Sequence, residues 1–161
     1  MTSGDSLSMH TASSLQEALQ LPDATLDSVR RLTALLYEQG KTDAALELCR
    51  GLVALHPHRA AGWSALGAVL TRLERHDEAV EALDRALELD PRDTAALVNR
   101  AECRIAAGDN AAAAADLDRA IELDPRHEDP AANRARQIAF AMYAIFAQCV
   151  AEGLDRVQLQ G

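Results

Sequence analysis

The side chains that could bind a metal in this sequence are two neighbouring histidines and three cysteines. His56 and His58 stand two positions apart, but neither has an acidic residue or a cysteine at the spacing of a metal site. Cys49, Cys103 and Cys149 are far apart and form no C-x-x-C pair. We therefore expect no bound metal and no disulfide framework, which suits a reducing compartment.

Catalytic signatures are absent from the sequence. No G-x-S-x-G, H-E-x-x-H or glycine-rich phosphate loop occurs in it. Asp and Glu are numerous, but they fall at exposed helical positions and in Glu-Leu-Asp-Pro segments, which is typical of a solvated surface. We therefore expect a protein that is not an enzyme and has no cofactor.

Two arginines, Arg100 and Arg104, are four residues apart and so lie on one face of a helix. They could form a basic recognition spot. The alternative is structural: Arg100 forms an ion pair with Asp116 on a neighbouring helix, while its aliphatic stem covers apolar surface. We favour the ion pair, because buried arginines are usually paired.

The composition favours an all-α protein. Of the 161 residues, 48% are hydrophobic, mostly Ala and Leu, and only 3% are aromatic. The formal charge is −9, which disfavours binding to nucleic acid or to an anionic membrane. The most apolar run, Ile138 to Val150, has 13 residues and is too short to span a bilayer. Residues 1–8 show no secretory signal, so we expect a soluble, cytoplasmic protein.

A pattern recurs every 34 residues and indicates how the chain is organised. Pro57, Pro91 and Pro125 are spaced by 34 positions, and two of them end a Leu-Asp-Pro segment. The period defines three units at 26–59, 60–93 and 94–127, which together cover 102 residues. The flanking regions are residues 1–25 and 128–161.

Each unit contains the apolar spacing of two antiparallel helices. One set of equivalent positions holds Ala45, Ala79 and Ala113, the next holds Cys49, Leu83 and Leu117, and a third holds Leu52, Ala86 and Ala120. Their separation by four and then three residues is one face of a helix. Polar segments at 39–41, 74–76 and 108–110 predict the turns. Small residues at Gly67 and Ala101 would let the paired helices approach closely.

Both ends of the chain predict further helices. Ser13 and Ser14 precede a short helix over residues 15–21, and the first repeat helix is expected to start at Asp27 or Ser28. A long helix is expected from Ala131 to about Gly153. Its apolar face comprises Ala135, Ile138, Met142, Ile145, Phe146 and Cys149. This face suits a cap on the last repeat, but Phe140 and Tyr143 widen it, so a self-association surface is an equal alternative.

The second unit resembles the tetratricopeptide repeat (TPR) motif. The matching residues are Trp63, Leu66, Gly67, Leu70, Ala79, Leu83, Ala86 and Pro91. The resemblance implies an all-α TPR solenoid of three helix-turn-helix repeats, with a short N-terminal helix and a long C-terminal capping helix. It also implies a concave groove that is lined by the first helix of each repeat.

Positions along the three first helices give the expected peptide-binding groove. Its residues are Arg30, Ala34, Tyr37, Ser64, Ala68, Thr71, Val98, Glu102 and Ile105. Most are small or apolar, so the groove could admit an extended peptide or a partner helix. The same residues could instead pack against the terminal helices. TPR arrays that clamp a C-terminal carboxylate use lysine, arginine and asparagine at five positions, which are held here by Arg30, Ala34, Ala65, Ala95 and Asn99. Only Arg30 keeps the charge, so a clamp is not expected.

The whole layout resembles the class II chaperones of bacterial type III secretion. The local matches are Tyr37 to Lys41, Leu52, Leu66 to Ala68, and Ala101 to Cys103. The resemblance implies that the groove holds a Pro-x-Leu-x-x-Pro-like segment of a hydrophobic translocator, and that the protein dimerises through its N-terminal region. The family's aromatic residues after Trp63 are missing here. The alternatives are a generic TPR scaffold or adaptor that joins components of a larger complex, and an accessory subunit that regulates an enzyme.

Overall fold

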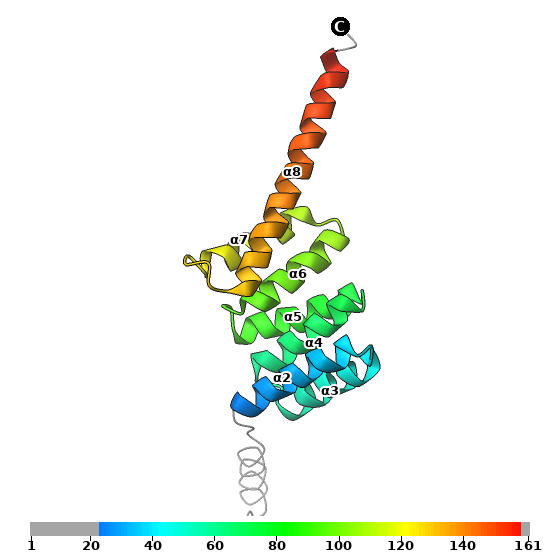
Figure 1. The fold of residues 1–161 in the computed structure, drawn as a ribbon, viewed down its shortest axis with the longest axis vertical. Coiled ribbons are helices and arrows are strands. Elements are labelled where there is room, and N and C mark those ends of the chain that lie inside the picture. Colours follow the sequence, from blue (N-terminus) through cyan, green and yellow to red (C-terminus); the bar gives the residue numbers. More distant parts are fainter. Residues whose placement is uncertain (1–22, 159–161) are drawn as a thin grey trace, which may run out of the picture.

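The computed structural model describes residues 23–158, excluding the side chains of 23–27, 29, 30, 34 and 153–158, and these residues form an elongated stack of helices (Figure 1). In chain order the helices are α2 (Asp23–Glu38), α3 (Thr42–Leu55), α4 (Ala60–Arg72), α5 (His76–Leu89), α6 (Thr94–Ala106), α7 (Asn110–Glu122) and α8 (Pro130–Gln158). Residues 23–158 contain no strand. The expected all-α solenoid is therefore confirmed. The helix expected over residues 15–21 lies outside the described residues.

The helices pair as antiparallel hairpins, α2 with α3, α4 with α5 and α6 with α7, and each hairpin packs on the next. Their turns fall where the polar segments predicted them. Gly40 and Gly108 adopt positive φ angles of 72° and 80° in these turns, and Glu74 at the equivalent position has φ 58°. The repeat thus imposes a left-handed residue at this position, whether or not a glycine occupies it.

Two helices have bounds that differ from the sequence prediction, and one of them is α8, which runs from Pro130 to Gln158 and not from Ala131 to about Gly153. The first repeat helix begins at Asp23 and not at Asp27 or Ser28, because nothing between Pro22 and Thr25 breaks a helix. Asp93 and Asp109 cap α6 and α7 by accepting hydrogen bonds from the main-chain N–H groups of Ala96 and Ala112, at 2.9 and 3.1 Å. Such caps satisfy N–H groups that have no partner inside the helix.

The core follows the predicted periodicity. Ala45, Cys49, Ala79, Leu83, Ala86, Ala113, Leu117 and Ala120 are fully buried. Gly67 on α4 packs so closely on α5 that an added Cβ would lie 2.4 Å from Cγ of Leu83. The prediction of close approach at Gly67 is confirmed, with Leu83 as the residue that it contacts.

The last helix is longer than the others and only part of it packs on the repeats. α8 has 29 residues, whereas α4 and α6 have 13 each. It packs against α6 and α7, its buried residues Ala132 and Ala135 lie in its first half, and its C-terminal end extends beyond the stack (Figure 1). Among the described residues no helix is both long and apolar enough to cross a bilayer.

Candidate functional site

The first helices of the repeats lie next to one another, with α4 in contact with α2 and with α6. They carry the residues that the sequence assigned to a groove. Tyr37, Ser64, Ala68, Glu102 and Ile105 are half-buried and therefore accessible from solvent. The side chains of Arg30 and Ala34 lie outside the described part. We use the name first-helix face for the surface around Tyr37, Ser64, Ala65, Ala68 and Glu102.

Two of the expected groove residues are buried, which corrects the sequence prediction. Val98 is only 1% exposed, because α6 has α4 on one side and α8 on the other. Thr71 donates a hydrogen bond to the carbonyl of Gly67 at 2.9 Å, and its hydroxyl lies 3.3 Å from Sγ of Cys103 on α6. Both side chains therefore contribute to packing between repeats and cannot contact a partner in this structure.

A cation–π pair borders the first-helix face. The guanidinium carbon of Arg72, at the end of α4, lies 5.0 Å from the centre of the Tyr37 ring on α2. Such pairs are worth about 0.5–1 kcal/mol at exposed sites. The pair links the first two repeats and leaves part of an aromatic ring beside the small side chains of α4.

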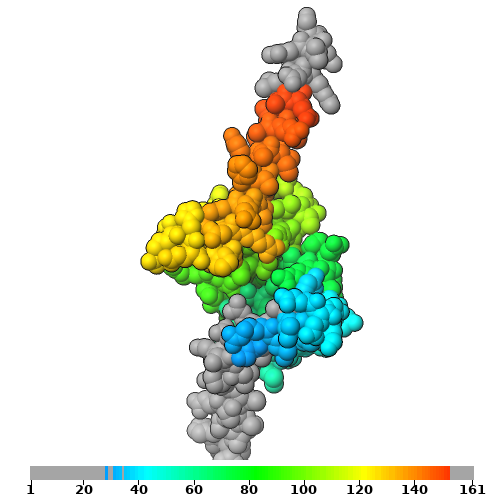
Figure 2. Space-filling model, in the orientation of Figure 1, coloured from blue at the N-terminus to red at the C-terminus, as the bar shows by residue number. Residues whose placement is uncertain are grey.

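The third repeat contributes charge and contacts with the terminal helix. Glu102 on α6 forms an ion pair with Arg134 on α8. Ile105 lines a hollow between α6, α7 and α8. Glu102 and Ile105 therefore pack against the C-terminal helix, as one of the two alternatives predicted. The small residues of α4 remain the accessible centre of the first-helix face. Figure 2 shows the orange atoms of α8 at one end of the stack and the blue and cyan atoms of the first repeat at the other.

A polar hollow of about 250 Å³ adjoins the first-helix face at the N-terminal ends of α4 and α6. It is lined by Ala60, Ala61, Ser64, Asp90, Arg92, Asp93 and Thr94. The sequence prediction included only Ser64. Asp90, Arg92 and Asp93 come from the loop between repeats, and the position of this loop relative to the start of α4 depends on how the hairpins stack.

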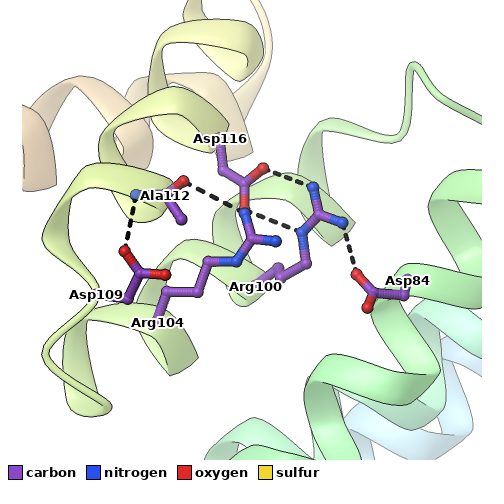
Figure 3. A network of polar contacts seen from close by, with 6 residues as sticks. All are labelled: Asp84, Arg100, Arg104, Asp109, Ala112 and Asp116. Atoms are coloured by element: carbon purple, nitrogen blue, oxygen red, sulfur yellow. Dashed lines mark hydrogen bonds and ion pairs between the residues drawn. The ribbon is translucent and has the colours of Figure 1, made fainter.

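The arginine pair forms a network of ion pairs and hydrogen bonds between helices (Figure 3). Arg100 bonds both oxygens of Asp116 and also reaches Asp84 on α5 at 2.6 Å. Arg104 bonds the same carboxylate of Asp116 at 2.6 Å. Burial alone would lower the pKa of Arg100, but the bonds and charges of Asp116 and Asp84 raise it above its ordinary value. The predicted ion pair is confirmed, and with 17% of its side chain exposed Arg100 is committed to this network.

Residues with metal-binding chemistry do not gather in the described part of the chain, where no group of three or more His, Cys, Asp and Glu side chains could hold an ion. His58 is exposed and His56 is half-buried. Cys49 and Cys103 are buried and Cys149 is exposed. Burial raises the pKa of the Cys49 and Cys103 thiols, although hydrogen bonds with Thr33 and Thr71 oppose the shift.

Comparison with known protein families agrees with the stacked hairpins. A tetratricopeptide repeat model matches residues 34–94 and again residues 65–128, which together make up more than half of the chain. The protein therefore belongs to the tetratricopeptide repeat family. Members of this family stack helix pairs into solenoids, as observed here.

Individual relatives show how general this fold is. A peroxisomal targeting signal receptor of Eremothecium gossypii is 32% identical over 77 residues, which are 48% of this chain and 14% of that receptor. The match thus spans only a small part of the relative. The shared segment is long enough to hold about two repeats of the 34-residue period.

Two solved structures cover a larger share of this chain. The type III secretion translocator chaperone SycD of Yersinia enterocolitica, described as an alternative dimer, superposes with a TM-score of 0.67 at 21% identity over 78% of this chain and 96% of its own. PcrH, in complex with the chaperone-binding region of PopD, gives 0.66 at 24% identity over 78% and 96%. These likenesses show that the fold is shared.

Proposed function

We propose that this protein is a non-enzymatic, cytoplasmic chaperone that holds an extended segment of a translocator-type protein on its first-helix face. The observation that carries the proposal is the size of the side chains on α4. Ser64, Ala65 and Ala68 are small and half-buried, so the backbone of an extended chain can approach α4 closely. The side chains of that chain would supply the bulk that the face lacks.

The borders of the face suit a polypeptide with both apolar and polar groups. Tyr37 presents part of an aromatic ring at one side. The Glu102–Arg134 ion pair lies at the other side and can exchange hydrogen bonds with a peptide backbone. A largely apolar client segment would be removed from water here, while the acidic exterior of the chaperone keeps the complex soluble.

Two complexes of proteins with the same fold support this choice of client. PcrH was solved with a region of PopD, and SycD of Yersinia enterocolitica was solved with a peptide of the translocator YopD. The second structure superposes on this chain with a TM-score of 0.63 at 22% identity. For this chain a translocator-type client is our proposal, and it rests on the shared fold together with the small side chains of α4.

Other TPR domains of similar fold were solved with heat-shock protein peptides, among them the first TPR of Spaghetti bound to the Hsp90 peptide SRMEEVD. Binding of an acidic C-terminus requires several cations and amides at fixed positions. Ala65 and Ala95 occupy two of those positions here, and Asn99 is only 8% exposed. We therefore expect no tight binding of SRMEEVD.

The test is co-expression with a translocator encoded in the same genome, measured as the soluble fraction of that translocator. We expect the wild type to raise solubility and Ala68→Glu to abolish the effect, because an unpaired carboxylate would be buried against an apolar client. The matched control is Ala115→Glu, which places the same charge at an exposed position of α7. Thermal melting of both variants separates loss of binding from loss of folding.

The same experiment distinguishes the alternative of a scaffold or adaptor that joins folded proteins. A scaffold would leave the translocator insoluble, and Ala68→Glu would not change that. If Ala68→Glu and Ala115→Glu raised the solubility of the translocator equally, the proposal would also be contradicted, since the first-helix face would then not be the binding surface. Fluorescence anisotropy measures the affinity of the labelled SRMEEVD peptide for this protein. A dissociation constant in the micromolar range would point to a different client.

A further inference from the structure

The middle of α8 exposes a concentration of large apolar side chains. Phe140 is 75% exposed, Tyr143 70%, Ile145 64% and Phe146 67%. Tyr143, Ile145 and Phe146 lie beside the end of the third repeat, where they line a hollow together with residues of α6 and α7. A soluble protein rarely leaves several neighbouring aromatic residues in water, and such a patch marks a surface that another molecule covers.

The sequence of this segment is unlike that of a solvent-exposed helix. Residues 137–151 contain no Asp, Glu, Lys or Arg, although such residues make up 25% of the chain. A helix that is apolar on all sides is usually buried on more than one side. Among the described residues of α8 only Ala132 and Ala135 are buried, so residues 137–151 need a neighbour that the described part of the single chain does not supply.

A hollow lies at the base of this segment. Its volume is about 590 Å³, and it is lined by Ile105 and by residues of α7 on one side and by Ala139, Met142, Tyr143, Ile145 and Phe146 of α8 on the other. The lining is mostly apolar, with Asn110 and Asp118 contributing polar groups. A helix that packs along α8 at Phe146 would place its own apolar side chains in this hollow.

We propose that a second copy of this chain covers the segment, with the two α8 helices packed antiparallel about a two-fold axis at Phe146. Met142, Tyr143 and Phe146 line the hollow, and Cys149 and Val150 continue the same side of α8 beyond it. They follow the spacing of one helix face. This interface does not depend on the proposed chaperone function and uses a different surface from the first-helix face.

Symmetry is the reason for choosing a second copy as the occupant. An antiparallel two-fold pairing requires that the contact face match itself. Met142 and Val150 are each four residues from Phe146, and Tyr143 and Cys149 are each three residues from it. Each larger side chain of one copy therefore meets a smaller one of the other, and the two Phe146 rings meet at the axis.

Charge and area are consistent with this pairing. Each copy has a formal charge of −9, so a contact between two copies is least unfavourable where no like charges meet, and residues 137–151 provide such an uncharged surface. With an aromatic side chain burying roughly 150–250 Å², Tyr143 and Phe146 supply on the order of 300–500 Å² per copy, to which Met142, Cys149 and Val150 add. Two copies together therefore approach about 1,200 Å², the lower end of stable specific interfaces.

The first test is the mass of the full chain in solution, measured by sedimentation equilibrium over a range of concentrations. We expect a dimer of twice the 17.3 kDa chain. Phe146→Glu should shift the protein to monomer, because two carboxylates would face each other at the axis. Ala144→Glu adds the same charge on the opposite side of α8 and should remain dimeric. Both residues are exposed in the single chain, so circular dichroism should show unchanged helix content.

The second test addresses the geometry. In a Cys149→Ser background, Phe146→Cys should form an intermolecular disulfide on mild oxidation, because the two copies of residue 146 meet at the axis. Ala144→Cys should not cross-link under the same conditions. The other two cysteines, Cys49 and Cys103, are buried and should not contribute.

Two results would overturn the proposal. One is a monomer at every concentration up to about 1 mM, which is far above the dissociation constant of a stable dimer. This result would mean that another molecule covers α8. A dimer that survives Phe146→Glu would place the contact elsewhere, for example in residues 1–22. Neither result would affect the solubility test of the first-helix face.

Discussion

Arg100 on α6 and Asp116 on α7 form a two-pronged ion pair, in which Nε and Nη2 of the arginine donate to Oδ2 and Oδ1 of the carboxylate at 2.9 and 2.6 Å. Arg104 donates to the same carboxylate, so two arginines share one acid. Arg100 also reaches Asp84 in the preceding hairpin. The network therefore holds the third repeat together and links it to the second.

Removal of the shared acid should be costly. Asp116→Ala leaves Arg104 without its carboxylate and Arg100 with only the half-exposed Asp84, and we expect a loss of about 3–5 kcal/mol in the free energy of unfolding. Asp84→Ala is the matched control. Because the Asp84 side chain is 48% exposed, its removal should cost about 1 kcal/mol or less. Urea denaturation of both variants measures the difference, and equal losses would contradict the central role of Asp116.

The close contact between α4 and α5 can be tested at a single glycine. Gly67→Ala would place a methyl group 2.4 Å from Cγ of Leu83, and overpacking of this kind typically costs about 1–3 kcal/mol. Gly51→Ala in α3 is the control, because an added Cβ there meets nothing within 4 Å. That change should stabilise the protein by about 0.5–1 kcal/mol. The two melting temperatures should move in opposite directions.

The second turn offers a stabilising change. Glu74 has φ 58° where the other repeats have Gly40 and Gly108, and a side chain in this region strains the backbone. We expect Glu74→Gly to raise the free energy of unfolding by about 0.5–1 kcal/mol. The reverse change, Gly108→Ala, should lower it. Thermal unfolding measures the change in stability of both variants. A destabilised Glu74→Gly variant would mean that the interactions of the Glu74 side chain stabilise the protein by more than the backbone strain destabilises it.

The contact between α8 and the end of the third repeat should depend on pH. Burial would raise the pKa of Asp124, but hydrogen bonds from the main-chain N–H of Glu128 and from Arg136 outweigh it and hold the pKa below its ordinary value. A lowered pKa in the folded state adds stability at neutral pH, and this stability is lost as the pH falls below the ordinary value of about 3.9. Asp124→Asn should remove this part of the acid sensitivity.

Acid titration followed by circular dichroism measures the effect. The wild type should lose more stability between about pH 4 and pH 2 than the Asp124→Asn variant does. Asp118→Asn is the control, because Asp118 is exposed. If Asp124→Asn and Asp118→Asn change the acid transition equally, Asp124 does not anchor α8.

The sequence by itself determined the hairpins, their turns and the buried positions. A 34-residue period places Ala79, Leu83 and Ala86 on one helix face, and the same pattern recurs in each repeat. Such periodicity is local, because a helix fixes which residues share a face whatever lies nearby. The Arg100–Asp116 pair was predictable for a similar reason, since both residues belong to one hairpin.

Only the tertiary structure decided which of the expected groove residues remain accessible. Val98 is buried because α6 has a helix on either side, and Thr71 is buried because its hydroxyl meets Cys103 in the next repeat. Asp84 joins the arginine network across two hairpins, and α8 extends past the last one. Burial of this kind depends on the distance and angle between neighbouring hairpins, which the spacing of residues within one helix does not specify.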